Sequence, residues 1–330
     1  MGSSATTDNG DRSGKRRRSL SKLVQIAFVL VAVGLATWAV ASRWSQVSEA
    51  WSRVTVWPML AAMALATAGS YASFPSWRLL LAGLGSPLPV APARRVFFLG
   101  QLGKYVPGGV WAVIAQVTLA RALHVPRARS ASASLLTILI GIVSSGSLGA
   151  LCLLIGGREV LGRYAPALLL IVVLIVLLHP GLLVRLAALA SRVTGRNVHI
   201  DRIPGRTIAA SVGIQITGLV LLGLHFYFVI GTVGGTYVSP ILAIGLLNVS
   251  LAAGMLAVFA PAGAGVREAI LTLGLSPFMS PGSALLIALM SRVLTIIADV
   301  LVAGGAALLG RTRPVSEPAP DDRASHGTGR

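Results

Sequence analysis

Long apolar runs alternate with short segments that carry arginine, and this alternation organises most of the sequence. An α-helix of about 20 apolar residues crosses the roughly 30 Å hydrocarbon core of a bilayer. Runs of about that length recur along the chain, and each ends in a polar or arginine-bearing segment. The pattern predicts an all-α polytopic membrane protein with spans over residues 23–41, 57–77, 131–156, 165–183, 207–232 and 284–309.

A further apolar segment, residues 94–121, is interrupted by the sequence GKYVPGG. At 1.5 Å per residue, the part before Lys104 reaches roughly 13 Å and the part after Gly109 roughly 18 Å, so neither crosses a bilayer alone. Pro107 removes a backbone donor and two glycines follow it, which predicts that one helix stops here and another begins. Because open backbone at membrane depth must be covered by protein or line a water-filled cavity, we interpret residues 96–120 as a re-entrant hairpin. The alternative is a continuous span with a proline kink.

Residues 240–275 form a second apolar segment, which APAGAGVRE interrupts at residues 260–268. If both interrupted segments are re-entrant, the chain has six spans; if both cross fully, it has eight. Six spans place most loop arginines in the cytoplasm, as the positive-inside rule requires, whereas eight reverse that asymmetry. We therefore predict six transmembrane helices and two re-entrant hairpins, with both termini cytoplasmic and these arginines inside: Arg78, Arg94, Arg95, Arg121, Arg127, Arg129, Arg185, Arg192, Arg196, Arg202 and Arg206.

Composition supports a membrane location. Of 330 residues, 55% are hydrophobic and 12% charged, and the mean hydropathy is +0.80. A net charge of +18 would suggest nucleic acid as the partner of a soluble chain, but here the arginines lie between apolar runs, as membrane orientation produces. We expect the plasma membrane as the location and no nucleic-acid partner. Cys152 is the only cysteine in the sequence, so neither a disulfide framework nor a paired-cysteine metal motif is expected.

The two ends of the chain differ in composition from the rest. Residues 1–22 and 311–330 are rich in Ser, Asp, Gly or Pro, and we expect both to be disordered cytoplasmic tails. Between them we expect one membrane domain, residues 23–310. Ala39-Val40-Ala41 resembles a signal-peptidase site, but the apolar run before it is longer than a usual signal-peptide core, so we favour an uncleaved anchor.

The membrane domain divides into two halves, about residues 23–156 and 165–310, each with three spans and one hairpin. The halves begin on opposite sides of the membrane, which is the signature of an inverted repeat. The two interruptions also correspond. Tyr105-Val106-Pro107-Gly108-Gly109 and Phe259-Ala260-Pro261-Ala262-Gly263 both read aromatic, small apolar, proline, glycine or alanine, glycine.

Five charged residues are expected within the membrane, where each costs about 2.5–3.5 kcal/mol on insertion scales and so needs a reason. Lys104 at a hairpin tip could bind a phosphate oxygen or extend to the cytoplasmic interface. Glu268, beside Arg267, could serve the site or complement a helix N-terminus. Arg292 could bind ligand or pair with Glu268, because Asp299 on the same helix face is roughly 10 Å away. Glu268 and Asp299 are also candidates to carry a proton or balance a charge.

The helices that start after the two Pro-containing turns would direct free N–H groups towards the middle of the membrane. Such helix ends bind anions, so with the nearby cations they predict a site for a phosphate head group. The residues predicted to form it are Lys104, Tyr105, Pro107, Gly108, Gly109, Pro261, Gly263, Arg267, Glu268 and Arg292. Four polar side chains could line the same path or join helices by hydrogen bonds: Gln101, Gln116, Gln215 and Asn248.

The motifs GQLGKYVPGGVWAVIAQVTLAR and APAGAGVREAIL, together with Arg292, make the chain resemble the transmembrane region of lysylphosphatidylglycerol synthases and its stand-alone, flippase-like relatives. The likeness covers roughly residues 23–310, and the chain departs from it at Ala262, where the family more often has glycine. The resemblance implies a lipid-handling membrane domain. It does not imply lysyl transfer, because the aminoacyl-transferase domain of the synthases would follow the membrane part and the sequence ends soon after it.

Signals for an enzyme are weak. Gly103-Lys104 lacks the rest of a phosphate-binding loop, and His124, His179, His199 and His225 show no metal-ligand spacing, so we expect no catalytic residues, metal or cofactor. We predict a lipid translocase-like protein whose partners are anionic or phosphate-bearing membrane lipids. The first alternative is a non-transporting scaffold for an envelope glycosyltransferase or lipid-modifying partner. A weaker one is an intramembrane enzyme acting on a lipid-linked sugar.

Overall fold

A computed structural model describes residues 41–42, 44–52, 55–106, 109–156, 203–233, 237–258 and 260–309. This part of the chain is helical and contains no strand. The expected tails, 1–22 and 311–330, the predicted span 165–183 and nearly all of the predicted span 23–41 lie outside the described residues. The prediction of an all-α protein is confirmed for the part that the structure describes.

Four long helices form the frame: α3 (Val56–Gly83), α6 (Arg127–Gly156), α9 (Gly205–Val233) and α12 (Pro281–Leu309). They confirm four of the predicted apolar runs as continuous helices, each a little longer than expected. The helices α6, α9 and α12 are long and apolar enough to cross a membrane. The 28 residues of α3 span about 42 Å and continue through Pro75.

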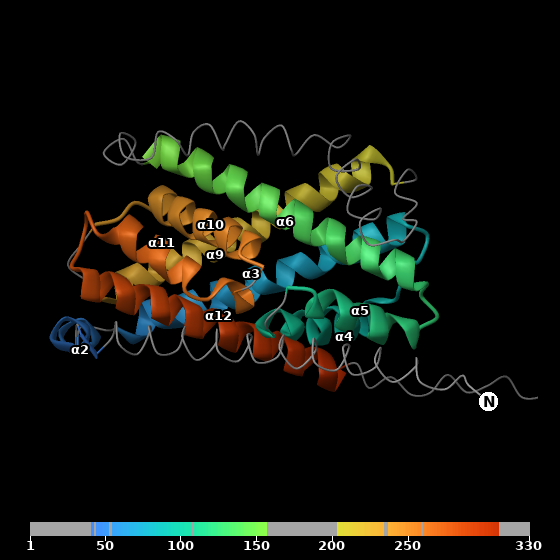
Figure 1. Ribbon diagram of the computed structural model, residues 1–330, viewed down its shortest axis with the longest axis horizontal. Coiled ribbons are helices and arrows are strands. Elements are labelled where there is room, and N and C mark those ends of the chain that lie inside the picture. Colours follow the sequence, from blue (N-terminus) through green and yellow to red (C-terminus); the bar gives the residue numbers. More distant parts are fainter. Residues whose placement is uncertain are drawn as a thin grey trace, which may run out of the picture.

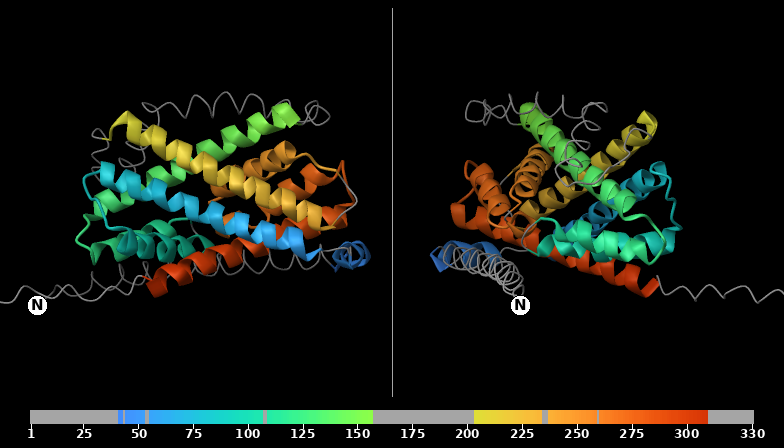
Figure 2. Two further views of the ribbon diagram at one scale, coloured as in Figure 1. Left: turned by 180° about the vertical axis from the view of Figure 1, so that it is seen from behind. Right: turned by 45° about the vertical axis from the view of Figure 1, so that its right-hand side comes forward.

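The helices α3 and α9 run antiparallel and side by side, on the face of the bundle that is in front in the left view of Figure 2. The start of α3 bonds to the end of α9, because the Thr55 N–H donates to the Thr232 carbonyl at 3.1 Å. Where the two helices cross, a Cβ on Gly69 would lie 3.0 Å from the Gly218 carbonyl and 2.7 Å from Leu222 Cγ. The two glycines therefore allow the backbones to approach closely.

The first interrupted segment forms two short helices, α4 (Val90–Gln101) and α5 (Trp111–Arg121), joined by the 3₁₀ turn η1 (Leu102–Tyr105). The helices pack against one another, so the chain doubles back on itself in this segment. Gly100 permits the contact, because a Cβ there would overlap the side chain of Gln116. Arg129 at the start of α6 donates to the Gly85 carbonyl at 2.9 Å, so the chain enters and leaves this hairpin at the same end of the bundle.

The second interrupted segment has the same form. The helix α10 (Pro240–Leu256) is followed by the 3₁₀ turn η2 (Pro261–Gly263) and α11 (Val266–Leu275). The helix α10 begins at a proline in its first turn, and the Ser239 hydroxyl caps it by accepting from the Leu242 N–H at 3.2 Å. The tips of the two hairpins touch, since η1 contacts η2 and a Cβ on Gly109 would lie 2.6 Å from Val258 Cγ1.

The packing of the two described halves corresponds pair by pair. When α3, α4, α5 and α6 are matched in order with α9, α10, α11 and α12, each contact between helices has a counterpart. For example, α6 packs against α10 of the other half, and α12 packs against α4. In both views of Figure 2, each hairpin lies between long helices of both halves.

The two ends of the bundle have different surfaces. The short helix α2 (Trp44–Ser52) packs against α12 beside the start of α3 (Figure 1). Trp44, Trp51 and Trp57 are exposed there, as expected of an aromatic belt at a membrane interface. The other end holds the loops between α3 and α4 and between α5 and α6, and it carries Arg78, Arg94, Arg95, Arg121, Arg127, Arg129 and Arg206.

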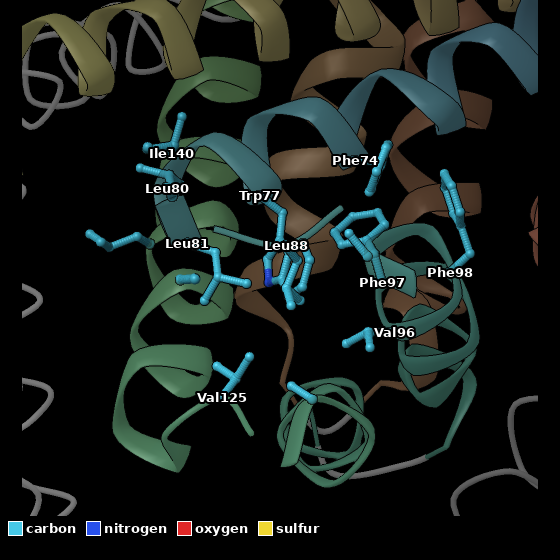
Figure 3. Close-up of a cluster of buried hydrophobic side chains, with 14 of the residues drawn as sticks. Phe74, Trp77, Leu80, Leu81, Leu88, Val96, Phe97, Phe98, Val125 and Ile140 are labelled. Carbon is cyan, nitrogen blue, oxygen red and sulfur yellow. The ribbon is translucent and has the colours of Figure 1, made fainter. Parts of the chain in front are cut away.

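Two hydrophobic cores stabilise the bundle, one towards each end. Figure 3 shows the first, in which Trp77 of α3 packs against Phe97 of α4 with ring centroids 5.6 Å apart. The second core joins α9, α10, α11 and the first half of α12. Along α12, residues 284–294 contribute to the second core and residues 302–306 to the first. The charged side chains of α12 lie at middle height, with Arg292 near the end of the first of these stretches and Asp299 between the two.

Candidate functional site

Asp299 of α12 is the centre of one charged group. Its carboxylate lies 2.6 Å from the Lys104 ammonium and accepts a hydrogen bond of 2.5 Å from the Tyr105 hydroxyl. Ser70 of α3 lies beside this carboxylate and favours its charged form. The Lys104 nitrogen lies 5.4 Å from the centroid of the Tyr105 ring. These contacts attach the tip of the first hairpin to α12, and Lys104 keeps 35% of its side chain exposed.

Arg292, also on α12, holds the tip of the second hairpin. Its guanidinium lies 3.1 Å from Glu268 Oε1 and donates to the carbonyls of Pro261 and Ala262, each at 3.1 Å. The other Glu268 oxygen accepts from the Gly265 N–H at 2.7 Å, so Glu268 also caps α11. The sequence left two roles open for Arg292, ligand binding or pairing with Glu268, and the structure contains the pair. Glu268 likewise has the helix-capping role that the sequence suggested.

The backbone of the second turn is left-handed at two successive residues. Ala262 has φ 48° and ψ 32°, and Gly263 has φ 70°. This conformation explains why a glycine at position 262 would suit the turn better than the alanine present. A Cβ on Gly263 would lie 2.6 Å from the Gly254 Cα, so this glycine is also required for packing against α10. The conformation points the carbonyls of Pro261 and Ala262 at Arg292.

Arg267 adds a third cation to the cluster. Its stem packs over Gly254, where a Cβ would lie 2.7 Å from Arg267 Cγ. The Arg267 Nε is buried and has no hydrogen-bond partner among the described residues. The side chain is within electrostatic reach of Arg292, Glu268, Tyr105 and Asp299.

We define the charge cluster as Lys104, Tyr105, Arg267, Glu268, Arg292 and Asp299. Its three cations and two anions leave one net positive charge at middle height, where the two hairpin tips meet. Such a site can accept one anion, and a buried, unpartnered guanidinium N–H is a donor that a phosphate oxygen could satisfy.

A cavity of about 150 Å³ opens beside this cluster. Lys104 and Asp299 lie at its charged wall, and the rest is formed by α3, α4, α5, α6, α9 and α10. Of the polar residues predicted to line a path, Gln101, Gln116 and Gln215 line this cavity. Asn248 does not; it donates to the carbonyls of Leu219 and Ile244. Of the two roles considered for Asn248, the structure therefore shows hydrogen bonding and not the lining of this cavity.

The structure brings most of the predicted residues together. Lys104, Tyr105, Pro261, Gly263, Arg267, Glu268, Arg292 and Asp299 surround the two hairpin tips, and Gly109 with φ 64° packs against Val258. Pro107 and Gly108 lie outside the described residues. One expectation needs correction. Because α11 begins at Val266 and Glu268 already bonds to the Gly265 N–H, the N-terminus of α11 does not present all its N–H groups to a ligand.

Sequence reasoning missed two polar residues near the charge cluster. Ser70 reaches Asp299, and a serine in an apolar helix gave no signal of this. His225 of α9 is fully buried, lies 2.9 Å from the Ala62 carbonyl through Nδ1 and 3.0 Å from the Ser291 hydroxyl through Nε2. These contacts join α3, α9 and α12. Ser291, the partner on α12, directly precedes Arg292. A lone histidine within an apolar run carries no spacing pattern that would reveal such contacts.

No group of three or more His, Cys, Asp or Glu side chains that could hold a metal ion occurs in the part of the chain that the structure describes. No curated protein sequence matches the chain significantly. The family model described as the lysylphosphatidylglycerol synthase TM region matches residues 23–303, which is most of the sequence. The chain, with its two hairpins and the charge cluster between them, therefore belongs to the family of the lysylphosphatidylglycerol synthase transmembrane region, a family of integral membrane proteins related to lipid handling.

Proposed function

We propose that this protein is a lipid translocase-like membrane protein that binds the phosphate of a lipid head group at the charge cluster. The observation that carries the proposal is the convergence of three cations from two hairpins and α12 at the middle of an apolar bundle, with one net positive charge. A charge at this depth is costly, and the two anions present compensate only two of the three cations. A lipid phosphate supplies the missing negative charge.

The proposed topology has six spans and two re-entrant hairpins arranged as an inverted repeat. The Arg129 contact with the loop before α4 supports it, because both ends of the first hairpin lie at the arginine-rich end of the bundle. The exposed tryptophans at the opposite end support the same placement of the membrane. In this topology the arginine-rich end is cytoplasmic, and the charge cluster lies at the depth where the hairpins from the two sides meet.

In the proposed mechanism, α12 is the element that both hairpins share. A phosphate that approaches Lys104 competes with Asp299 for the ammonium, while Arg267 offers a guanidinium N–H that has no partner among the described residues. Weakening the contact between Lys104 and Asp299 frees the tip of the first hairpin from α12. The head group could then pass from one side of the cluster to the other. Transport would be downhill, coupled to a proton on Asp299 or Glu268, or driven by a partner protein.

A leaflet-resolved assay tests this function. The full-length protein is reconstituted into liposomes with a fluorescent anionic phospholipid in one leaflet, and the fraction reaching the other leaflet is measured with a membrane-impermeant quencher. We expect faster exchange than in protein-free liposomes, and loss of that increase in Lys104→Met and Arg267→Met. Exchange at the protein-free rate, combined with stable co-purification of an envelope glycosyltransferase, would instead establish the scaffold alternative.

A further inference from the structure

The cavity beside the charge cluster has a largely apolar wall that also carries a set of uncharged hydrogen-bonding groups. Ser70 and Ser73 come from α3, Gln116 from α5, Thr137 from α6 and Gln215 from α9. Gln116 and Gln215 are almost fully buried, at 3% and 6% exposure. Buried amides and hydroxyls at middle height in an apolar bundle are costly unless they are satisfied by protein, water or ligand. The chemistry of this wall therefore limits what the cavity holds.

Both glutamines retain hydrogen-bonding capacity. Gln215 donates one N–H to the Thr137 carbonyl at 3.3 Å and accepts from the Ser73 hydroxyl at 3.3 Å. Gln116 accepts from the Ser134 hydroxyl and donates to the Phe97 carbonyl at 3.5 Å. A primary amide has two N–H donors and two acceptor sites, so each side chain has a donor and an acceptor to spare. The bonds of 3.3–3.5 Å are also long, and a better-placed partner can replace them.

The same wall is poorly suited to a cation. Among the described residues that line the cavity, Asp299 is the only carboxylate, and it already accepts from Lys104 and Tyr105. An amine on a head group would have to share that carboxylate with Lys104 and would be repelled by its ammonium. A lysyl group, which carries two amines, would be less favourable still. Hydroxyl groups meet neither difficulty, because they both donate and accept without charge.

We propose that this cavity binds the uncharged, polyhydroxylated part of a lipid head group, either glycerol or a sugar, while the phosphate lies at Lys104. This inference rests on the proposed function and specifies its substrate class. The volume of about 150 Å³ holds roughly ten waters by the space that each needs, which suffices for a glycerol or a single sugar ring. The hydroxyls of the head group replace that water and bond to Gln116, Gln215 and Thr137.

The test compares lipids with the same phosphodiester charge and different head groups. The full-length protein is placed in phosphatidylcholine nanodiscs with an equal fraction of phosphatidylglycerol, phosphatidylinositol or phosphatidylethanol, and bound lipid is measured by native mass spectrometry. Phosphatidylethanol carries an ethyl group on its phosphate in place of glycerol or inositol, so its head group has no hydroxyl. We expect phosphatidylglycerol or phosphatidylinositol to bind about tenfold tighter, which corresponds to one or two hydrogen bonds. Whichever of the two binds better identifies the head group as glycerol-sized or sugar-sized.

Variants separate the cavity from the phosphate site. A Cβ on Gly141 would lie 3.6 Å from Met255 Cε and 3.7 Å from Gln215 Nε2, both ordinary contacts, so we expect Gly141→Val to fold and to extend a side chain into the cavity. Gln215→Leu removes the amide at similar volume. In both variants, the affinity for phosphatidylglycerol or phosphatidylinositol should fall to about that for phosphatidylethanol, and phosphatidylethanol should still bind. Gly213→Val is the matched control, because nothing lies within 4 Å of a Cβ there. It should keep the preference.

The outcomes distinguish the two proposals. Equal binding of all three anionic lipids to the unaltered protein would overturn the polyhydroxyl inference and leave the phosphate site intact. A preference that survives both Gly141→Val and Gln215→Leu would also overturn it, because the hydroxyls would then bind elsewhere. Binding of none of the three above the phosphatidylcholine background would overturn the proposed function itself.

Discussion

Arg292 and Asp299 lie two turns apart on α12, and each holds the tip of a different hairpin. Arg292 binds Glu268 and the carbonyls of the second turn, whereas Asp299 binds Lys104 and Tyr105 of the first. Seven residues are close to two helical turns, so both side chains project from one face. One helix thereby carries both connections, and a movement of α12 would affect both hairpins together.

Arg292 and Glu268 should not contribute equally to the stability of the fold. Arg292→Gln leaves Glu268 and two carbonyls without their cation, whereas Glu268→Gln leaves Arg292 bonded to the carbonyls. Removing one partner of a buried pair costs about 3–5 kcal/mol, and we expect Arg292→Gln to approach that cost and Glu268→Gln to stay below it. Thermal unfolding and monodispersity of the purified protein in detergent would measure the difference.

The double variant, Glu268→Gln with Arg292→Gln, separates structure from function. Recovery of both folded protein and lipid exchange would show that the pair only stabilises the fold, and the lipid site would then be confined to Lys104 and the first hairpin. Normal folding with continued loss of exchange would support a role of Arg292 in binding phosphate. Equal destabilisation by the two single variants would contradict the asymmetry inferred from the carbonyl contacts.

Asp299 and Lys104 should have opposite effects on lipid binding. Asp299→Asn removes the competing carboxylate from Lys104, so we expect the affinity for an anionic lipid to rise severalfold. Lys104→Met removes the cation and should lower it. Tyr105→Phe, which loses only the hydroxyl bond to Asp299, is the control and should have a smaller effect than either. A fall in anionic-lipid binding by folded Asp299→Asn protein would contradict the competition.

A single substitution in the second turn should make the protein more stable to unfolding. Ala262 is left-handed, a conformation that costs a non-glycine residue about 1–2 kcal/mol, so Ala262→Gly should raise the unfolding temperature by a few degrees. Gly263→Ala should lower it, because its Cβ would lie 2.6 Å from the Gly254 Cα. Differential scanning fluorimetry on the purified protein would measure both. A lower unfolding temperature for Ala262→Gly would show that the alanine side chain contributes more than its backbone costs.

Cysteine accessibility would test the proposed topology. In a Cys152→Ala background, cysteines at Val90 and Ala122, exposed at the two ends of the first hairpin, should both be shielded from an impermeant external reagent. Cysteines at Tyr237 and Ser280, exposed at the ends of the second hairpin, should both be labelled. Labelling at position 122 without labelling at position 90 would replace the hairpin with a span.

Within the described residues, the hydrophobic pattern predicted the four long helices and both interruptions well. Apolar runs of span length have few stable alternatives to helix, so residues 131–156 and 207–232 correspond closely to α6 and α9. Proline and glycine also act locally, through a missing donor and a missing side chain, which is why the breaks near Pro107 and Pro261 could be read directly. The left-handed backbone at Ala262 was not predicted, although the sequence has alanine where the family more often has glycine.

The pairing of charges depended on packing that no local pattern records. Lys104 and Asp299 are 195 residues apart, and Tyr105 and Asp299 are 194 apart, and they meet only because α12 of one half packs against the hairpin of the other. Contact between the halves also forms the cavity, since Gln116 and Gln215 come from α5 and α9, helices of different halves that both pack against α6. Sequence by itself determined which residues were costly to bury. Only the tertiary structure decided which of them compensate one another, because compensation between charges depends on distance in space.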